Sequence, residues 1–281
     1  MLAARAGAAE PDEVARGAYL ANAADCAACH TDSQHGGRPY AGGRAIATPF
    51  GTFYSPNITP DPDTGIGRWS EAQFLRALRD GVSPDGSNYF TVFPYTSFTK
   101  IVDADARAIW AYLRSLPAVH HPNRKHDIFF PFSWRPLLTV WKWLFFDRGP
   151  FRPNPDRSAT DNRGAYLVTA LAHCGECHTP RNFLGATEPS RFLAGTARGP
   201  DGKPVPNITP DPGTGIGNWT KDDIVGVLTD GETPDLNFVT GAMAEVVKST
   251  AKLTEADRRA IAVYLKSVPA LRSGSLPSAA K

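Results

Sequence analysis

The chain has 281 residues, which is long enough for two modest domains with separate hydrophobic cores. Its formal charge of +2 gives no electrostatic basis for nucleic-acid binding, and its apolar runs are shorter than the roughly 18 residues of a membrane-spanning helix. The 25 glycines and 25 prolines predict many loops between short regular elements.

The first predicted element is a helix over residues 11–24, with Pro11 at its start and apolar residues at helical spacing. It leads into the motif CAACH, and a second such motif, CGECH, lies much further along the chain. The motifs contain Cys26, Cys29 and His30, and Cys174, Cys177 and His178, and they use every cysteine. In C-x-x-C-H, each sulfur bonds to a vinyl group of a c-type haem and the histidine binds the iron. The sequence therefore predicts two covalently attached haems.

Other uses of paired cysteines fit the sequence less well. A zinc site made from both C-x-x-C pairs would join segments as far apart as Cys26 and Cys174 and would not need the histidines. A thioredoxin-like redox pair follows a strand, whereas the residues before each motif have a helical pattern. A disulfide within either motif would be strained.

An internal repeat organises the chain. The string PNITPDPDTGIGRW at residues 56–69 returns almost unchanged as PNITPDPGTGIGNW at residues 206–219, and the haem motifs and last helices repeat in the same order. The repeat predicts two domains, 10–118 and 159–270, joined by a linker at 119–158.

Each copy has the same predicted elements after its haem motif. A loop rich in glycine and proline is followed by a helix with Ser70 or Thr220 as N-cap, and a glycine stops that helix. A last helix ends at a proline, which cannot continue it. This pattern predicts an all-α protein with little or no sheet.

These strings resemble the multihaem cytochrome c subunits of periplasmic alcohol, gluconate and related dehydrogenases. The likeness is carried by TPFGTFYSPNITPDPDTGIGRWS, by FPFSWRPLL in the linker and by HCGECHTPRNFLGA in the second copy. It implies two tandem class I cytochrome c domains in a subunit that relays electrons from a dehydrogenase to a quinone, an oxidase or a soluble cytochrome. Those subunits commonly have three haem domains and a membrane-associated tail, so this chain looks like a shorter, dihaem member.

The second axial ligand of the iron differs between the copies. Such a domain usually supplies it from a loop before the last helix, and methionine there raises the potential. Met243 lies in that loop of the second copy, and Phe93 stands at the corresponding position of the first. We therefore expect ligation by His178 and Met243 at haem 2, which argues for electron flow from haem 1 to haem 2.

Phenylalanine cannot bind iron, so haem 1 needs another ligand or keeps an open site. His126 is the first candidate, because its segment could fold back over the haem. The other candidates are His35, His120, His121, Tyr89, Tyr95 and Lys100. An open site would also suit a second hypothesis, a peroxidase-like or thiosulfate-oxidising dihaem enzyme.

Further pocket residues are expected from the repeated string. The carbonyls of Pro56 and Pro206 are candidates to accept from the Nδ1–H of each ligand histidine. Propionates are expected to bind Asn57, Trp69, Asn207 and Trp219, with loop packing as the alternative role of the tryptophans. Tyr19 and Tyr166 are expected to pack on Tyr112 and Tyr264 of the last helices.

The linker segment 127–151 is rich in tryptophan and phenylalanine, but Arg135, Pro136 and Lys142 exclude a membrane span. We expect it to pack across both domains, with an exposed patch for a catalytic partner or the membrane surface as the alternative. The chain shows no nucleophile, acid–base group or nucleotide loop, so a partner subunit would oxidise the substrate. Haem attachment implies the periplasm, and the first residues look like the end of a signal peptide.

Overall fold

The computed structural model describes residues 10–199 and 202–274, so the expected signal-peptide remnant at residues 1–9 lies outside the described part. The first half contains α1 (Pro11–Ala23), α2 (Cys26–Cys29), the 3₁₀ turn η1 (Ser33–His35), β1 (Ala45–Thr48), β2 (Gly51–Tyr54), α3 (Glu71–Asp80), α4 (Tyr95–Phe98) and α5 (Asp103–Ser115). Between the halves lie β3 (Asp127–Ile128) and α6 (Leu137–Phe145). The second half contains α7 (Ala159–Tyr166), the π-helical turn η2 (Leu167–Leu171), α8 (Gly175–His178), the 3₁₀ turn η3 (Pro189–Arg191), α9 (Lys221–Asp230), α10 (Ala242–Thr250) and α11 (Glu255–Ser267).

The first and last helices of each half cross in close contact. At the crossing of α1 and α5, a Cβ on Gly17 would lie 1.9 Å from the carbonyl oxygen of Ala108. At the crossing of α7 and α11, a Cβ on Gly164 would lie 2.0 Å from the carbonyl oxygen of Ala260. Only glycine permits this approach, so both halves are built on the same helix pair.

The second copy has one more residue than the first between its first helix and its haem motif, and the structure places it in η2. There the helix that begins as α7 continues as a π-helical turn through Leu171. A π turn takes one residue more than an α turn, so it absorbs the insertion without moving the motif away from the helix.

The helices after the long loops have the predicted ends. Ser70 caps α3 and forms a capping box with Gln73, and Thr220 does the same for α9 with Asp223. Both helices end at a glycine with positive φ. The two caps were predicted from the sequence, and the structure confirms them.

The prediction of a mostly helical protein is confirmed, but the protein is not entirely without sheet. Strands β1, β2 and β3 form a small antiparallel sheet in that order. The strands are too short to show an alternating pattern, and β3 comes from the segment between the halves. This pairing brings residues near 126–128 over the haem loop of the first half.

Segment 119–158 follows the surface of the first half and also contacts the second half. Lys142 of α6 donates to the carbonyl oxygens of Asp80 and Gly81, at the end of α3. The indole of Trp141 donates to the carbonyl oxygen of Leu184 in the second half, 2.9 Å away. Other aromatic side chains of the segment point outward: Trp143 is 83 % exposed and Phe130 is 78 % exposed. No helix in the described ranges is both long and apolar enough to cross a membrane.

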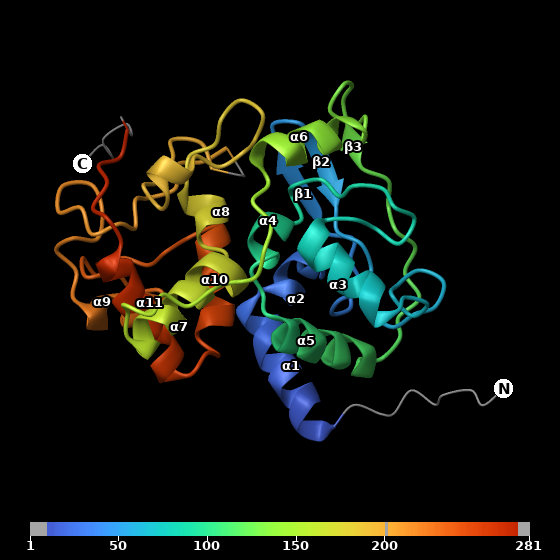
Figure 1. Ribbon diagram of the computed structural model, residues 1–281, viewed down its shortest axis with the longest axis horizontal. Helices are drawn as coiled ribbons and strands as arrows, with labels where there is room; N and C mark the ends of the chain where they lie inside the picture. The colour runs from blue at the N-terminus through green and yellow to red at the C-terminus, as the bar shows by residue number, and fades with distance from the viewer. Residues whose placement is uncertain (1–9, 200–201, 275–281) are drawn as a thin grey trace.

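The two halves lie side by side, with α1 to α5 on the right of Figure 1 and α7 to α11 on the left. They exchange a matching pair of hydrogen bonds. The hydroxyl of Tyr19 donates to Asp257, 2.6 Å away, and that of Tyr166 donates to Asp105, 2.7 Å away. The prediction that these tyrosines pack within their own halves missed this exchange, because each reaches the last helix of the other half.

Candidate haem sites

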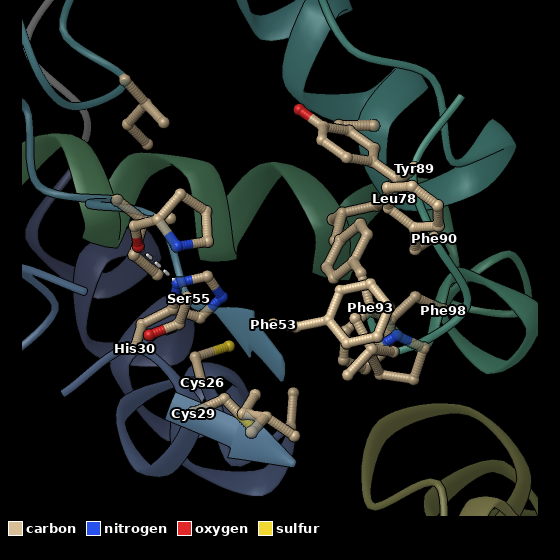
Figure 2. A pocket seen from close by; sticks show the side chains of 18 of the residues that line it. Cys26, Cys29, His30, Phe53, Ser55, Leu78, Tyr89, Phe90, Phe93 and Phe98 are labelled. Carbon is tan, nitrogen blue, oxygen red and sulfur yellow. Dashed lines mark hydrogen bonds between the residues drawn. The ribbon is translucent and has the colours of Figure 1, made fainter. Parts of the chain in front are cut away.

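The first haem motif forms one wall of a cavity. Short helix α2 places the sulfurs of Cys26 and Cys29 beside His30, as Figure 2 shows. The ring Nδ1 of His30 lies 2.8 Å from the carbonyl oxygen of Pro56, which fixes the plane of the imidazole. The proton on Nδ1 then leaves the lone pair of Nε2 free to bind iron.

The second motif has the same arrangement. Nδ1 of His178 lies 2.8 Å from the carbonyl oxygen of Pro206, and α8 presents the motif after Cys174. Burial lowers the pKa of both His30 and His178, while the proline carbonyls oppose this shift. Both rings are therefore held neutral and oriented, as an iron ligand must be.

Three of the motif cysteines have thiols with raised pKa values. Burial raises the pKa of Cys26 and Cys174 to about 12 and that of Cys29 to about 11. Such thiols are poor nucleophiles and poor disulfide-exchange groups, which separates these sites from redox-active C-x-x-C pairs.

The cavity of the first half has a volume of about 310 Å³ and a mostly apolar lining. Opposite the motif stand the rings of Phe53, Phe93 and Phe98 (Figure 2). The paired sulfurs, the oriented imidazole and this apolar wall fit a planar porphyrin bonded at one edge.

Phe93 occupies the distal side of this cavity. Its ring packs edge-on against Tyr89 and Phe98, with ring centroids 5.5 and 5.7 Å apart. The position of the second half that corresponds to Phe93 is Met243. This side chain is half-buried in the first turn of α10. The structure thus keeps a phenyl ring in the first half where the second half has a thioether.

His126 also lines the cavity of the first half. Its ring packs against Phe53 and Phe90, and burial lowers its pKa. The backbone N–H of Tyr54 donates to its Nδ1, 3.2 Å away. An Nδ1 that accepts leaves the proton of the neutral ring on Nε2, and a protonated nitrogen cannot bind iron. In this arrangement His126 is a hydrogen-bond donor rather than a ligand.

The other candidate ligands of haem 1 are placed differently. Tyr89 lines the cavity, but His35 bonds to Asp32 at the surface and His120 lies near Asp61. The remaining candidates are His121, whose ring lies near Gly43, Tyr95, which packs on Phe146, and Lys100, which is beside Phe151.

The asparagines of the repeated string organise their own loops. The amide group of Asn57 donates to Thr64 and to the carbonyl oxygen of Val119, so both its hydrogens have protein acceptors. Asn207 repeats this with Thr214 and Leu271. Neither asparagine side chain therefore has an N–H left to donate to a propionate. Trp69 and Trp219 remain candidates for that role, and Trp69 lines the cavity.

Sequence reasoning did not identify His173 as a residue of the cavity. It comes from the second half, immediately before Cys174, yet it lines the cavity of the first half. Its ring is stacked on Phe98, with centroids 5.4 Å apart and planes at 29°. Only the packing of the halves reveals this, because a histidine before a haem motif has no distinctive pattern.

Known proteins are similar in sequence to most of this chain. A family model described as Cytochrome c matches residues 14–117. A protein named diheme cytochrome c-type from Cereibacter sphaeroides is 44 % identical over 264 residues, which cover 92 % of this chain and 87 % of that protein. The fructose dehydrogenase cytochrome subunit of Gluconobacter japonicus is 43 % identical over 92 % of this chain and 53 % of its own length. A nicotinate dehydrogenase subunit from Pseudomonas putida is 47 % identical over 90 % of this chain.

The chain belongs to the cytochrome c family. Within that family it is similar to diheme cytochrome c and to the cytochrome c subunits of alcohol, fructose and gluconate dehydrogenases. It spans about half the length of the fructose and alcohol dehydrogenase subunits and 21 % of the nicotinate dehydrogenase subunit.

Proposed function

We propose that this protein is a dihaem electron-transfer subunit that works with a dehydrogenase. The observation that carries the proposal is the matching geometry of the two motifs, in which each histidine is fixed by a proline carbonyl at the same distance of 2.8 Å. A haem bound at each motif supplies a one-electron carrier. The two copies then correspond to tandem class I cytochrome c domains, 10–118 and 159–270.

The chain's own residues would hold the two groups differently. Cys26, Cys29 and His30 would hold haem 1 in an apolar cavity that Phe93 lines. Cys174, Cys177 and His178 would hold haem 2, and Met243 would supply its second protein ligand. Since methionine ligation raises the potential, electrons would flow from haem 1 to haem 2.

The partners are proposed from the relatives. Relatives at 40–47 % identity are named as subunits of nicotinate, fructose, alcohol and gluconate dehydrogenases, which supports a dehydrogenase catalytic subunit as electron donor. A quinone, an oxidase or a soluble cytochrome would receive the electrons, in the periplasm. The exposed aromatic side chains of segment 119–158 offer a contact for the catalytic subunit, and a binding assay with liposomes would reveal membrane contact instead.

A haem count tests the proposal directly. Pyridine haemochrome analysis and intact mass of the protein made in a strain that matures c-type cytochromes should give two covalent haems per chain. The variant Cys26→Ala/Cys29→Ala should keep only haem 2, and Cys174→Ala/Cys177→Ala should keep only haem 1. A single haem in the unaltered chain would refute the dihaem assignment.

A second candidate function is a dihaem enzyme that is peroxidase-like or thiosulfate-oxidising. It is favoured by Phe93 and by the Nδ1 bond of His126, because neither of these side chains would then bind the iron of haem 1. One equivalent of carbon monoxide bound per two reduced haems would show an open site, and turnover with peroxide or thiosulfate would then support the enzyme. No binding at either haem would show that an internal residue has replaced the methionine.

A further inference from the structure

His173 lies at the meeting point of the two haem sites. Its backbone is bonded to Cys174, which anchors haem 2, while its ring lines the cavity of haem 1. Its φ of 40° is in the left-handed region, as is the φ of 54° at Asp25, the residue before the first motif. The two residues that precede the motifs thus share an uncommon backbone conformation.

One nitrogen of the His173 ring is buried without a hydrogen-bond partner in the described part of the chain. Its Nδ1 is buried and makes no hydrogen bond to any described residue. A buried polar atom left unpaired costs about 1–3 kcal/mol, so this placement is expensive for packing alone. The stacked contact with Phe98, itself 5 % exposed in the core of the first half, fixes the plane of the imidazole.

The surrounding contacts hold the two motifs against each other. Ser249 of α10 donates to Asp25, and its carbonyl oxygen accepts from Asn22, 2.8 Å away. In the other direction, Thr96 and Ser97 of α4 each donate to Glu176 inside the second motif, at 2.7 Å. Helix α4 of the first half therefore bonds to the second motif, and helix α10 of the second half bonds to the residues just before the first motif. In Figure 2, the ribbon of the second half lies beside Phe98.

We infer that His173 is the positioning residue of the junction between the haems, and that its stack on Phe98 sets how fast an electron crosses from one haem to the other. The inference rests on the proposed function, because it requires a haem at each motif. The step moves one electron: one iron goes from ferrous to ferric as the other goes from ferric to ferrous, and no proton or further reactant is needed.

A double-mutant cycle on the full-length dihaem protein tests the inference. His173→Ala removes the ring from one side of the contact, and Phe98→Leu removes its partner without altering the second motif. His35→Ala is the matched control, because His35 is an exposed histidine of the first half. The readout is the rate of electron equilibration between the haems after flash reduction by a flavin semiquinone, alongside the haem count and a spectroelectrochemical titration.

We expect both variants to slow equilibration severalfold, because each removes atoms from the packed contact between the two haem sites. The double variant should be no slower than the slower single variant, because both remove one contact. Rates equal to that of the unaltered protein, or effects that multiply, would overturn the inference while two haems remain. If the His173→Ala protein lacks haem 2, the equilibration rate of Phe98→Leu alone tests the inference, and a rate equal to that of the unaltered protein would overturn it. Fewer than two haems in the unaltered protein would instead refute the proposed function.

Discussion

At the scale of single residues, the two halves differ most clearly at positions 93 and 243. Both positions could be located from the sequence, because the repeat places phenylalanine where the other copy has methionine. The contacts of Phe93 with Tyr89 and Phe98 could not, since they depend on the packed cavity. The same holds for His126, whose Nδ1 bond to Tyr54 arises only when β3 pairs with β2. The sequence was therefore enough to pair positions 93 and 243, whereas the side chains that surround them in the cavity could be identified only from the fold.

The variant Phe93→Met should give haem 1 a sulfur ligand. Phenylalanine and methionine have similar volumes, so the exchange should cost less than about 1.5 kcal/mol of stability. We expect the potential of haem 1 to rise and its carbon monoxide binding to disappear, as measured by spectroelectrochemistry and by the visible spectrum of the reduced protein. Phe93→Leu, which has no sulfur, is the control and should change neither. Carbon monoxide binding that persists in Phe93→Met would contradict this assignment of the distal position.

At the scale of elements, helix ends were predictable and helix partners were not. The capping boxes of α3 and α9 depend on residues three positions apart, so the sequence shows them directly. The place of α6 depends instead on Lys142, which reaches the carbonyl end of α3, some sixty positions earlier. A basic side chain in an aromatic segment excludes a membrane span, but it does not reveal which helix end it will meet.

The variant Lys142→Met should loosen α6. The ammonium donates to three oxygens, those of Asp80, Gly81 and Asn88, and methionine can replace none of these bonds. We expect a loss of about 1–3 kcal/mol in the free energy of unfolding, measured with urea, and an unchanged haem content. Lys125→Met removes an exposed lysine of the same segment and should have little effect. Equal losses in both variants would show that Lys142 does not anchor the helix.

At the scale of the whole molecule, the halves are joined by contacts that cross between them in both directions. The carboxylate of Asp105 pairs with Arg16 and accepts from the hydroxyl of Tyr166. The carboxylate of Asp257 pairs with Arg163 and accepts from the hydroxyl of Tyr19. The charged pairs lie within one half and follow from its helix crossing. The two tyrosines can be recognised in the sequence repeat, but no short-range pattern shows that each one bonds to an aspartate of the other half.

The variant Tyr19→Phe changes a residue of the first half and should destabilise helix α11 of the second half. It removes a hydrogen bond to a carboxylate, which is worth about 1.5–3 kcal/mol, and keeps the ring. We expect faster backbone hydrogen exchange at the start of α11, measured by mass spectrometry. Tyr112→Phe is the control, because its hydroxyl contacts Tyr40 within the first half. Unchanged exchange in α11 would show that the bond does not couple the halves.

Acid should weaken the same contact. Burial alone would raise the pKa of Asp257, but the hydrogen bonds from Arg163 and Tyr19 outweigh burial and hold it below its usual value. A lowered carboxyl pKa stabilises the fold fully above the unfolded value of about 3.9, and this contribution is lost as the pH falls through the folded value. We therefore expect the free energy of unfolding to fall below about pH 4. In urea titrations at several pH values, Asp257→Asn should be less stable near neutrality and less sensitive to acid. If the free energy of unfolding of Asp257→Asn falls as steeply with acid as that of the unaltered protein, this role is contradicted.

The two tyrosine hydrogen bonds between the halves have a consequence for how the sequence of such a chain can evolve. Two identical copies of one half, packed in this way, would form a two-fold symmetric dimer in which every substitution appears twice. In a single fused chain, each half can vary alone while the tyrosine of its neighbour keeps the packing in place. Phenylalanine at position 93 beside methionine at position 243 is such a one-sided change, and a symmetric pair of chains encoded by one gene could not have made it.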